Sequence, residues 1–334
     1  MKAQVLHAHG EIGDVTYHAD WPDPKPQAGE VQFAVKACAL NYHDLFTLRG
    51  TPGIKVPMPI IMGIDAAGIV TEVGEGVTDW QPGDRVLVDP IDREKGKLFG
   101  EMVDGGLAEL AVVKAHQIIR LPDGIAFDAA AALPCAYGTA YRMMMTRGQV
   151  RAGESVFILG ASGGVGTCCV QLAKMAGAYV IAAASSPEKM ARLEALGADE
   201  VINYAERDFR QQIHELRGKP RVWGGGGVDV VVNFTGGDTW VPALRCLSRH
   251  GRMLTCGATA GFDPKTDIRF IWTFEQTIVG SNGWDRQDVI DLLGLVGKGE
   301  LTPVIGQTFP LDAAQEALHA LNDRQSFGKV ILAP

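Results

Sequence analysis

The sequence predicts an α/β protein in which a doubly wound parallel sheet is inserted into a mostly antiparallel β domain. Residues 1–125 hold short apolar runs broken by Gly and Pro, which is typical of strands joined by tight turns. Beyond Phe127, strand-like and helix-like segments alternate, and such alternation is typical of right-handed β-α-β units. A glycine cluster at 160–166 separates the first of these strands from its helix.

The β domain is predicted from its runs and turns, and it takes in both ends of the chain. Its expected strands are 30–37, 67–73, 84–88 and 106–113, with turn signals at 23–26, 81–84 and 121–124. From about Leu301, an amphipathic helix over 313–321 precedes a last apolar run that starts at Lys329. We expect this run to return to the β domain, which then comprises residues 1–125 and 290–334.

The inserted domain is predicted over residues 126–289. Its expected strands are 155–161, 179–184, 200–204, 228–234, 252–256 and 277–281. Its expected helices are 164–176, 187–196, 208–216 and 239–248. Largely apolar runs such as Val228–Phe234 are typical of parallel strands buried on both faces. The four glycines 224–227 precede a strand rather than a helix, so they indicate a flexible loop.

The glycine cluster has the context that a dinucleotide-binding loop needs. The apolar run Val156–Leu159 enters the cluster, and a helix-like segment follows it. Glycines allow a tight turn and close approach of a pyrophosphate, while the helix N-terminus offers unpaired N–H groups. We expect this loop to bind the pyrophosphate through Gly160, Ser162, Gly163, Gly164, Val165 and Gly166.

The next strand indicates which dinucleotide is bound. NAD sites usually place an acidic residue at the end of this strand, to bind the ribose 2′-hydroxyl. Here Ser185 and Ser186 follow the strand, and Lys189 comes soon after. Small hydroxyls and a cation suit a 2′-phosphate, so the sequence predicts NADP(H). The acidic residue Glu188 is also nearby and could bind a ribose 2′-hydroxyl, so NAD is the alternative cofactor.

Composition and charge exclude several classes of function. The 334 residues carry a net charge of −8, which disfavours nucleic acids and anionic membranes as partners. No apolar run approaches the length of a membrane span, and the first residues lack the apolar stretch of a secretory leader, so we expect neither feature. The six cysteines form no Cys-x-x-Cys pair, so neither a disulfide framework nor a zinc ribbon is predicted, and we expect a cytoplasmic protein.

Short motifs along nearly the whole chain carry a family resemblance. They are Gly63-Ile-Asp-Ala-Ala-Gly68, Gly74-Glu-Gly76, Pro82-Gly-Asp-Arg-Val86, Gly105-Gly-Leu-Ala-Glu109, Ala161-Ser-Gly-Gly-Val-Gly166, Leu196-Gly-Ala-Asp-Glu-Val-Ile-Asn-Tyr204 and Gly328-Lys-Val330. This set resembles the medium-chain dehydrogenase/reductase superfamily. The resemblance implies a GroES-like β domain and an inserted Rossmann domain, with the chemistry in the cleft between them.

Zinc enzymes of this superfamily bind catalytic zinc through a Cys, a His in Gly-His-Glu, and often a second Cys. The corresponding positions here are Asn41, Ile64 and Cys135. A catalytic zinc needs about three protein ligands, so we expect no metal. The pattern Asn41-Tyr42-x-Asp44 without zinc resembles the quinone oxidoreductase and enoyl reductase branch.

That branch implies hydride transfer from NADPH to an electron-poor acceptor, either a quinone, an enone or an enoyl thioester. Such an acceptor is already polarised by conjugation, so the protein need only orient it and stabilise the developing enolate. Two alternatives stay open: a metal-free alcohol dehydrogenase that uses a Tyr or His base, and a non-enzymatic NADPH-binding protein.

The resemblance also implies individual site residues. The nicotinamide is expected near Asn41, Thr139, Gly257, Ala258 and Ser281. The 2′-phosphate is expected near Ser185, Ser186, Lys189 and Tyr204, with Arg324 as a further member.

Tyr42 is the candidate for protonating or hydrogen-bonding the enolate, and the alternatives are a packed core aromatic at this position and protonation by solvent. His43 is either a relay or an exposed loop histidine, and Asp44 is expected to fix its loop through backbone hydrogen bonds. Relatives dimerise through the last Rossmann strand, so we expect a homodimer, or a dimer of dimers, built through residues 277–280.

Overall fold

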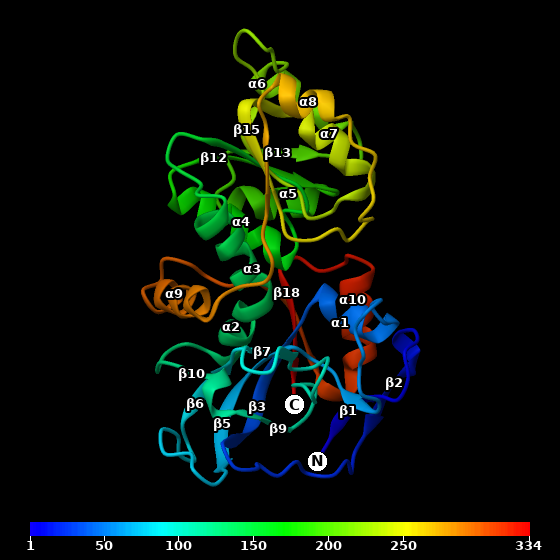
Figure 1. The fold of residues 1–334 in the computed structure, drawn as a ribbon, viewed down its shortest axis with the longest axis vertical. Coiled ribbons are helices and arrows are strands. Elements are labelled where there is room, and N and C mark those ends of the chain that lie inside the picture. The colour runs from blue at the N-terminus through cyan, green and yellow to red at the C-terminus, as the bar shows by residue number, and fades with distance from the viewer. The chain divides into compact units, whose positions relative to one another are not determined.

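The computed structural model describes all 334 residues, which form two compact units (Figure 1). Unit 1 comprises Met1–Tyr137 and Arg286–Pro334, and unit 2 comprises Gly138–Asp285. The boundaries predicted at 125/126 and 289/290 therefore differ from those of the structure. Helix α2 (Phe127–Ala131) packs on the β domain, and α9 (Arg286–Gly297) packs on the π-helical turn Leu133–Tyr137. These contacts hold both segments in unit 1.

The main sheet of unit 1 joins the two ends of the chain. Its order is β10-β6-β5-β3-β18-β17, and β9 also pairs with β3. The last strand, β18, returns to the β domain, as the sequence predicted (Figure 1). It pairs antiparallel with β3, with Ile331 opposite Ala39. The strands of this sheet are β3 (Glu30–Leu40), β5 (Asp65–Val73), β6 (Arg85–Val88), β9 (Leu110–Lys114), β10 (Ile118–Arg120), β17 (Ile305–Pro310) and β18 (Lys329–Ala333).

Smaller elements complete unit 1. A second sheet has the order β2-β1-β4, and β7 pairs with β8. Helices α1 and α10 pack against each other, and their apolar sides join one core with the main sheet, including Phe33, Leu45 and Leu318. The elements are β1 (Ala3–Leu6), β2 (Val15–His18), β4 (Ile60–Ile61), β7 (Ile91–Asp92), β8 (Lys97–Leu98), α1 (Tyr42–Arg49) and α10 (Ala314–Asn322), with single 3-10 turns at Ile12–Asp14, Ala115–Gln117 and Leu311–Ala313.

Unit 2 is a doubly wound sheet in which every neighbouring pair is parallel. Its order is β13-β12-β11-β14-β15-β16, so the chain direction across the sheet reverses between β11 and β14. Ligands bind at such a switch point, outside the carboxyl ends of the strands. The strands are β11 (Ser155–Ile158), β12 (Tyr179–Ala184), β13 (Glu200–Asn203), β14 (Val228–Val232), β15 (Leu247–Thr255) and β16 (Thr277–Gly280).

All four helices predicted for unit 2 are present, and the structure adds two that were not predicted, over Gly138–Tyr141 and Ile268–Thr273. The helix predicted over 239–248 ends at Leu244, and β15 begins at Leu247 rather than 252, because Leu247 pairs with Val228 ahead of an irregularity in the register. The helices are α3 (Gly138–Tyr141), α4 (Gly164–Met175), α5 (Pro187–Ala195), α6 (Phe209–Arg217), α7 (Trp240–Leu244) and α8 (Ile268–Thr273), with π-helical residues Arg142–Arg147 and a 3-10 turn Gly237–Thr239. Every helix of the chain is too short, or too polar, to cross a membrane.

Candidate functional site

The glycine loop after β11 has the geometry of a phosphate-binding turn. Gly160 has a φ of +69°, a conformation that glycine adopts at no steric cost. A Cβ on Gly166 would lie 2.2 Å from the carbonyl oxygen of Gly160, so helix α4 packs directly on the loop. A Cβ on Gly163, the N-cap of α4, would meet nothing closer than 3.7 Å. The loop therefore leaves the N-terminus of α4 open to an anion.

The predicted 2′-phosphate residues of unit 2 come together at the ends of β12 and β13. Ser185 is exposed after β12, and the hydroxyl of Ser186 caps α5 by accepting the Lys189 N–H at 3.3 Å. The N–H of Tyr204, just after β13, donates to Ala184 O at 3.1 Å, which places the two strand ends side by side. Arg324 belongs to unit 1 and is exposed, so its share in this cluster stays a prediction.

The loops after β14, β15 and β16 supply the rest of this edge. Gly257 is exposed and Ala258 half-buried after β15, and Thr139 is half-buried in α3. The Ser281 hydroxyl, just after β16, is buried and has no hydrogen-bond partner. Such an orphaned group suits a ligand that supplies the missing partner.

Sequence reasoning missed Asn233 at this edge. Its buried Oδ1 accepts the N–H groups of Thr235 and Gly236, each at 3.0 Å, and so shapes the loop after β14. This loop borders the glycine turn, because a Cβ on Gly160 would lie 3.0 Å from the Phe234 ring. The signal for Asn233 was its place, a polar residue directly after a buried apolar strand.

These observations fit a dinucleotide. The open helix N-terminus suits a pyrophosphate, and the exposed hydroxyl of Ser185, together with Lys189, suits a 2′-phosphate. The buried Ser281 hydroxyl has no hydrogen-bond partner in the protein, and a ligand can supply one. The half-buried residues Ser162, Gly164 and Val165 complete the turn.

Unit 1 holds a buried polar centre made by residues far apart in the sequence. Asn41 Nδ2 donates to Asp65 Oδ2 at 2.9 Å, and the ammonium of Lys329 donates to Asn41 Oδ1 and to Leu40 O. The backbone N–H of Cys135 donates to the other oxygen of Asp65 at 3.0 Å. Burial raises the pKa of Asp65, against the opposing effects of Lys329 and these hydrogen bonds.

This centre does not fit zinc. Ile64 offers no donor atom, and both ends of the Asn41 amide are already engaged. The Lys329 ammonium also provides a cation beside Asp65, and a second cation there would be repelled. Cys135 is then the one thiol among the three expected positions, which is too few ligands for a zinc ion.

The first turn of α1 carries the other candidate groups of unit 1. Asp44 Oδ2 accepts the N–H of Asn41 at 2.7 Å, as predicted, while burial raises the pKa of Asp44 to about 6. Tyr42 is half-buried, and its hydroxyl donates to Asn322 O at a long 3.5 Å. His43 lies on the helix rather than in a loop, and its Nε2 contacts Glu101 Oε1 at 2.8 Å. The sequence offered no signal for this partner.

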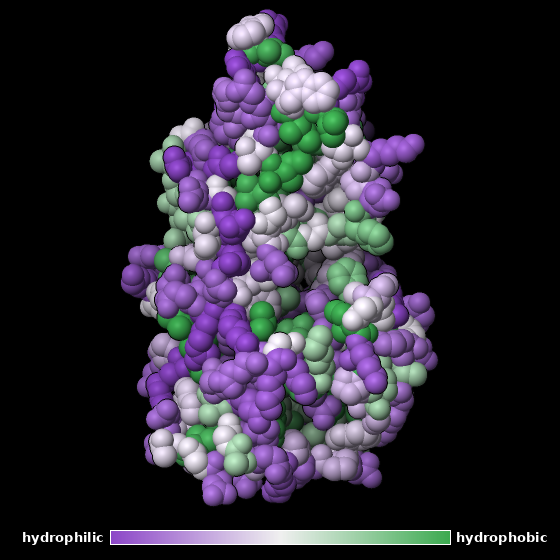
Figure 2. Space-filling view, viewed as in Figure 1, coloured by the Kyte–Doolittle hydropathy of each residue, from purple (hydrophilic) through white to green (hydrophobic).

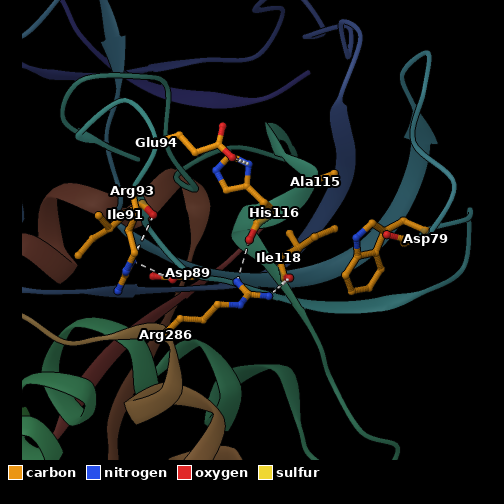
Figure 3. Close-up of a pocket in the computed structure, with 10 residues that line it drawn as sticks. Asp79, Asp89, Ile91, Arg93, Glu94, Ala115, His116, Ile118 and Arg286 are labelled. Atoms are coloured by element: carbon orange, nitrogen blue, oxygen red, sulfur yellow. Dashed lines mark hydrogen bonds and ion pairs between the residues drawn. The ribbon is translucent and has the colours of Figure 1, made fainter.

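A separate pocket of about 490 Å³ lies in unit 1 (Figure 3). Arg286 crosses it to donate to the carbonyl oxygens of His116 and Ile118 (Figure 3). Glu94 and His116 line this pocket, and their donor atoms lie within 4.8 Å of each other and of those of Asp92. The Asp92 carboxylate already accepts the N–H of Glu94 and contacts His116 Nε2. We therefore interpret this cluster as the cap of the turn after β7.

Two family models match the chain. One match lies within unit 1, and most of the other lies within unit 2. An alcohol dehydrogenase GroES-like domain matches residues 27–123, and a zinc-binding dehydrogenase matches residues 164–298. Acryloyl-coenzyme A reductase of Metallosphaera sedula is 32% identical, over 99% of either chain. Quinone oxidoreductase of Rattus norvegicus is 31% identical, over 92% of this chain and 90% of the relative.

One solved structure is informative about ligands. The 2-octenoyl-CoA carboxylase reductase CinF, solved in complex with NADP and 2-octenoyl-CoA, superposes with a TM-score of 0.86 and 27% identity. The match covers 99% of this chain and 87% of that one.

Proposed function

The chain belongs to the medium-chain dehydrogenase/reductase superfamily, in the branch of enoyl reductases and quinone oxidoreductases, and we propose that it is an NADPH-dependent, zinc-independent reductase of electron-poor C=C bonds or quinones. The buried centre of Asn41, Asp65 and Lys329 carries this proposal. Because its donor set does not fit zinc, it supplies no Lewis acid to polarise an alcohol or simple carbonyl oxygen. A conjugated acceptor needs no such help.

NADPH, when bound, supplies a hydride from its nicotinamide. The N-terminus of α4 and the open face of Gly163 would hold its pyrophosphate. Ser185, Ser186 and Lys189 would hold the 2′-phosphate, and charge-assisted hydrogen bonds to it favour NADPH over NADH.

Tyr42 would stabilise the enolate that forms on the acceptor. Its hydroxyl lies 3.5 Å from the Asn322 carbonyl, a weak hydrogen bond that a substrate oxygen can replace. A donor aimed at an oxygen that gains negative charge acts mainly in the transition state.

The main alternative is a metal-free alcohol dehydrogenase, which the descriptions of both family models keep in view. The two functions differ in their substrates, so a panel separates them. We would incubate the purified protein and NADPH with an enoyl-CoA thioester, a simple enone and 1,2-naphthoquinone, and separately NADP⁺ with primary and secondary alcohols, following absorbance at 340 nm. We expect turnover with the conjugated acceptors and none with the alcohols. Alcohol oxidation without turnover of any conjugated acceptor would establish the alternative. Tight NADPH binding without turnover in either arm would indicate a non-enzymatic role.

We also propose a homodimer, alone or doubled into a tetramer, built through β16. This edge strand exposes Ile278, and α8 nearby exposes Ile268 and Trp272 by 61% and 62%. Figure 2 shows hydrophobic side chains gathered on the part of unit 2 that carries α7 and α8. An unpaired apolar edge is an aggregation hazard, which a two-fold partner removes. Light scattering should give at least twice the mass of 35.7 kDa per chain, and Ile278→Lys should lower it; a monomeric parent protein would refute this proposal.

We also infer a cytoplasmic location, which fits six cysteines that form no disulfide bond.

A further inference from the structure

His43 is held by a buried carboxylate. Its Nε2 lies 2.8 Å from Glu101 Oε1, and Glu101 is only 2% exposed. The hydroxyl of Thr47, one turn along α1, can donate its single proton either to the same oxygen, at 3.3 Å, or to the His43 carbonyl, at 3.2 Å. Two elements, α1 and the turn after β8, therefore fix the imidazole ring from one side.

The other side of the ring is available. Nδ1 of His43 makes no hydrogen bond, and the side chain is 36% exposed. In this arrangement, one ring nitrogen contacts a buried carboxylate and the other is free. A carboxylate that orients an imidazole for proton transfer uses the same arrangement.

The charges around His43 favour its protonated form. Burial by itself lowers the pKa of His43, but the hydrogen bond and charge of Glu101, with the charges of Asp44 and Asp65, outweigh it and raise the pKa. These three carboxyls are the titratable groups that act on the ring, and Lys329 partly neutralises Asp65 behind them.

Resting on the function proposed above, we propose that His43, positioned by Glu101, donates the proton that completes the reduction. After hydride has added to the β-carbon, the former π electrons of the C=C bond reside on the enolate. The Nδ1–H bond of the imidazolium breaks as a C–H bond forms at the α-carbon. The product is the saturated thioester or ketone, and the neutral imidazole keeps its Nε2–H on Glu101. Solvent then returns a proton to Nδ1.

Two neighbouring side chains at the start of α1 then have different roles. Tyr42 hydrogen-bonds the enolate oxygen, whereas His43 protonates carbon. A general acid of this kind contributes roughly 10²–10⁴ in rate. Quinones need less help, because a hydroquinone oxygen is protonated readily by water.

The test compares His43→Gln and Glu101→Gln with the parent protein and with a matched control. His116→Gln serves as the control, because His116 also pairs through Nε2 with a buried carboxylate, Asp92, at 3.1 Å, but lies outside the proposed site. Thermal unfolding and NADPH affinity are measured first, and both should stay near parent values. With an enoyl thioester, His43→Gln should lower kcat about 10²-fold, whereas the loss with 1,2-naphthoquinone should be under about threefold.

Two readouts separate a catalytic role from a structural one. The kcat of the parent should fall at alkaline pH as His43 loses its proton. His43→Gln should abolish this alkaline limb of the pH profile. Glu101→Gln should shift the limb to lower pH. In D₂O the parent should place deuterium on one face of the α-carbon, and His43→Gln should give both stereoisomers. If the parent turns over enoyl thioesters but His43→Gln keeps its rate, alkaline limb and stereochemistry, the proton-donor role is wrong while the proposed function stands.

If the parent reduces no conjugated acceptor, the proposed function itself is wrong. Should His43→Gln fail to fold, the shift of the limb in Glu101→Gln decides.

Discussion

The ammonium nitrogen of Lys329 lies 3.5 Å from Asp65 Oδ2, and the two side chains are 2% and 0% exposed. Removing one partner of a buried pair leaves an uncompensated charge, which typically costs about 3–5 kcal/mol. We expect Lys329→Met to lower the free energy of unfolding by this amount in urea titrations. The double variant Lys329→Met/Asp65→Asn should recover part of the loss; a single variant as stable as the parent would show that solvent reaches Asp65.

The residues around this buried pair also predict that the protein holds no zinc. Elemental analysis of protein dialysed against a chelator should find far less than one zinc per chain, because the Asn41 amide is engaged and Ile64 offers no donor. Chelation should also leave the reductase activity unchanged. Retention of about one zinc per chain, with loss of activity on its removal, would contradict this prediction.

Lys189 should set the cofactor preference. We expect NADPH to bind at least tenfold more tightly than NADH, about 1.4 kcal/mol. Lys189→Ala should reduce that ratio by weakening NADPH alone, since it removes a charged partner of the 2′-phosphate. The exposed Lys219 offers the control substitution, Lys219→Ala. Nucleotide fluorescence titrations measure all six affinities, and equal affinities in the parent would refute the 2′-phosphate site.

Alanine substitutions at two glycines of the loop should have different effects, one on stability and the other on NADPH binding. Gly166→Ala would put a methyl 2.2 Å from the Gly160 carbonyl oxygen, so we expect destabilisation of about 1–3 kcal/mol. Gly163→Ala meets nothing within 3.7 Å and should leave the melting temperature unchanged. It should nevertheless weaken NADPH binding tenfold or more, because its methyl would stand where the pyrophosphate approaches. Parent-like affinity in Gly163→Ala would place the phosphates elsewhere.

Tyr42→Phe should lower kcat on enones and enoyl thioesters by about 10²–10³ and leave NADPH affinity nearly unchanged. The loss on quinones should be smaller. Unlike the His43 variant, it should preserve the alkaline limb of the pH profile, since the proton donor is intact. Full activity on every acceptor would make Tyr42 a packing residue.

Much of the fold was predictable because parallel strands buried on both faces form continuous apolar runs. The strands β12 and β16 lie where those runs predicted them. The segment 126–137 was assigned to the wrong unit because its small apolar residues suit either core, and the choice depends on contacts with β3 and β5. The start of β15 was missed for a similar reason, since its pairing with Val228 is long-range.

The site residues likewise fall into those that a local motif predicts and those that depend on long-range contacts. Residues in a local motif, such as Gly163 and Ser186, could be found because their role depends on neighbours in sequence. His43 and Glu101 are 58 residues apart, and Asn41 and Lys329 are 288 apart. Neither pairing leaves a local pattern, so both emerge only from the tertiary structure.

The position of β18 beside β3 has a consequence for the nascent protein. Lys329 lies 289 residues after Leu40, the carbonyl to which it donates. At bacterial or eukaryotic rates of about 5–20 residues per second, the ribosome takes about 15–60 s to cover that interval. During this time the edge of β3 and the carboxylate of Asp65 lack their final partners, while all of unit 2 has been synthesised. Unit 2 can therefore mature first, and unit 1 closes only after Lys329 and the rest of β18 have been synthesised.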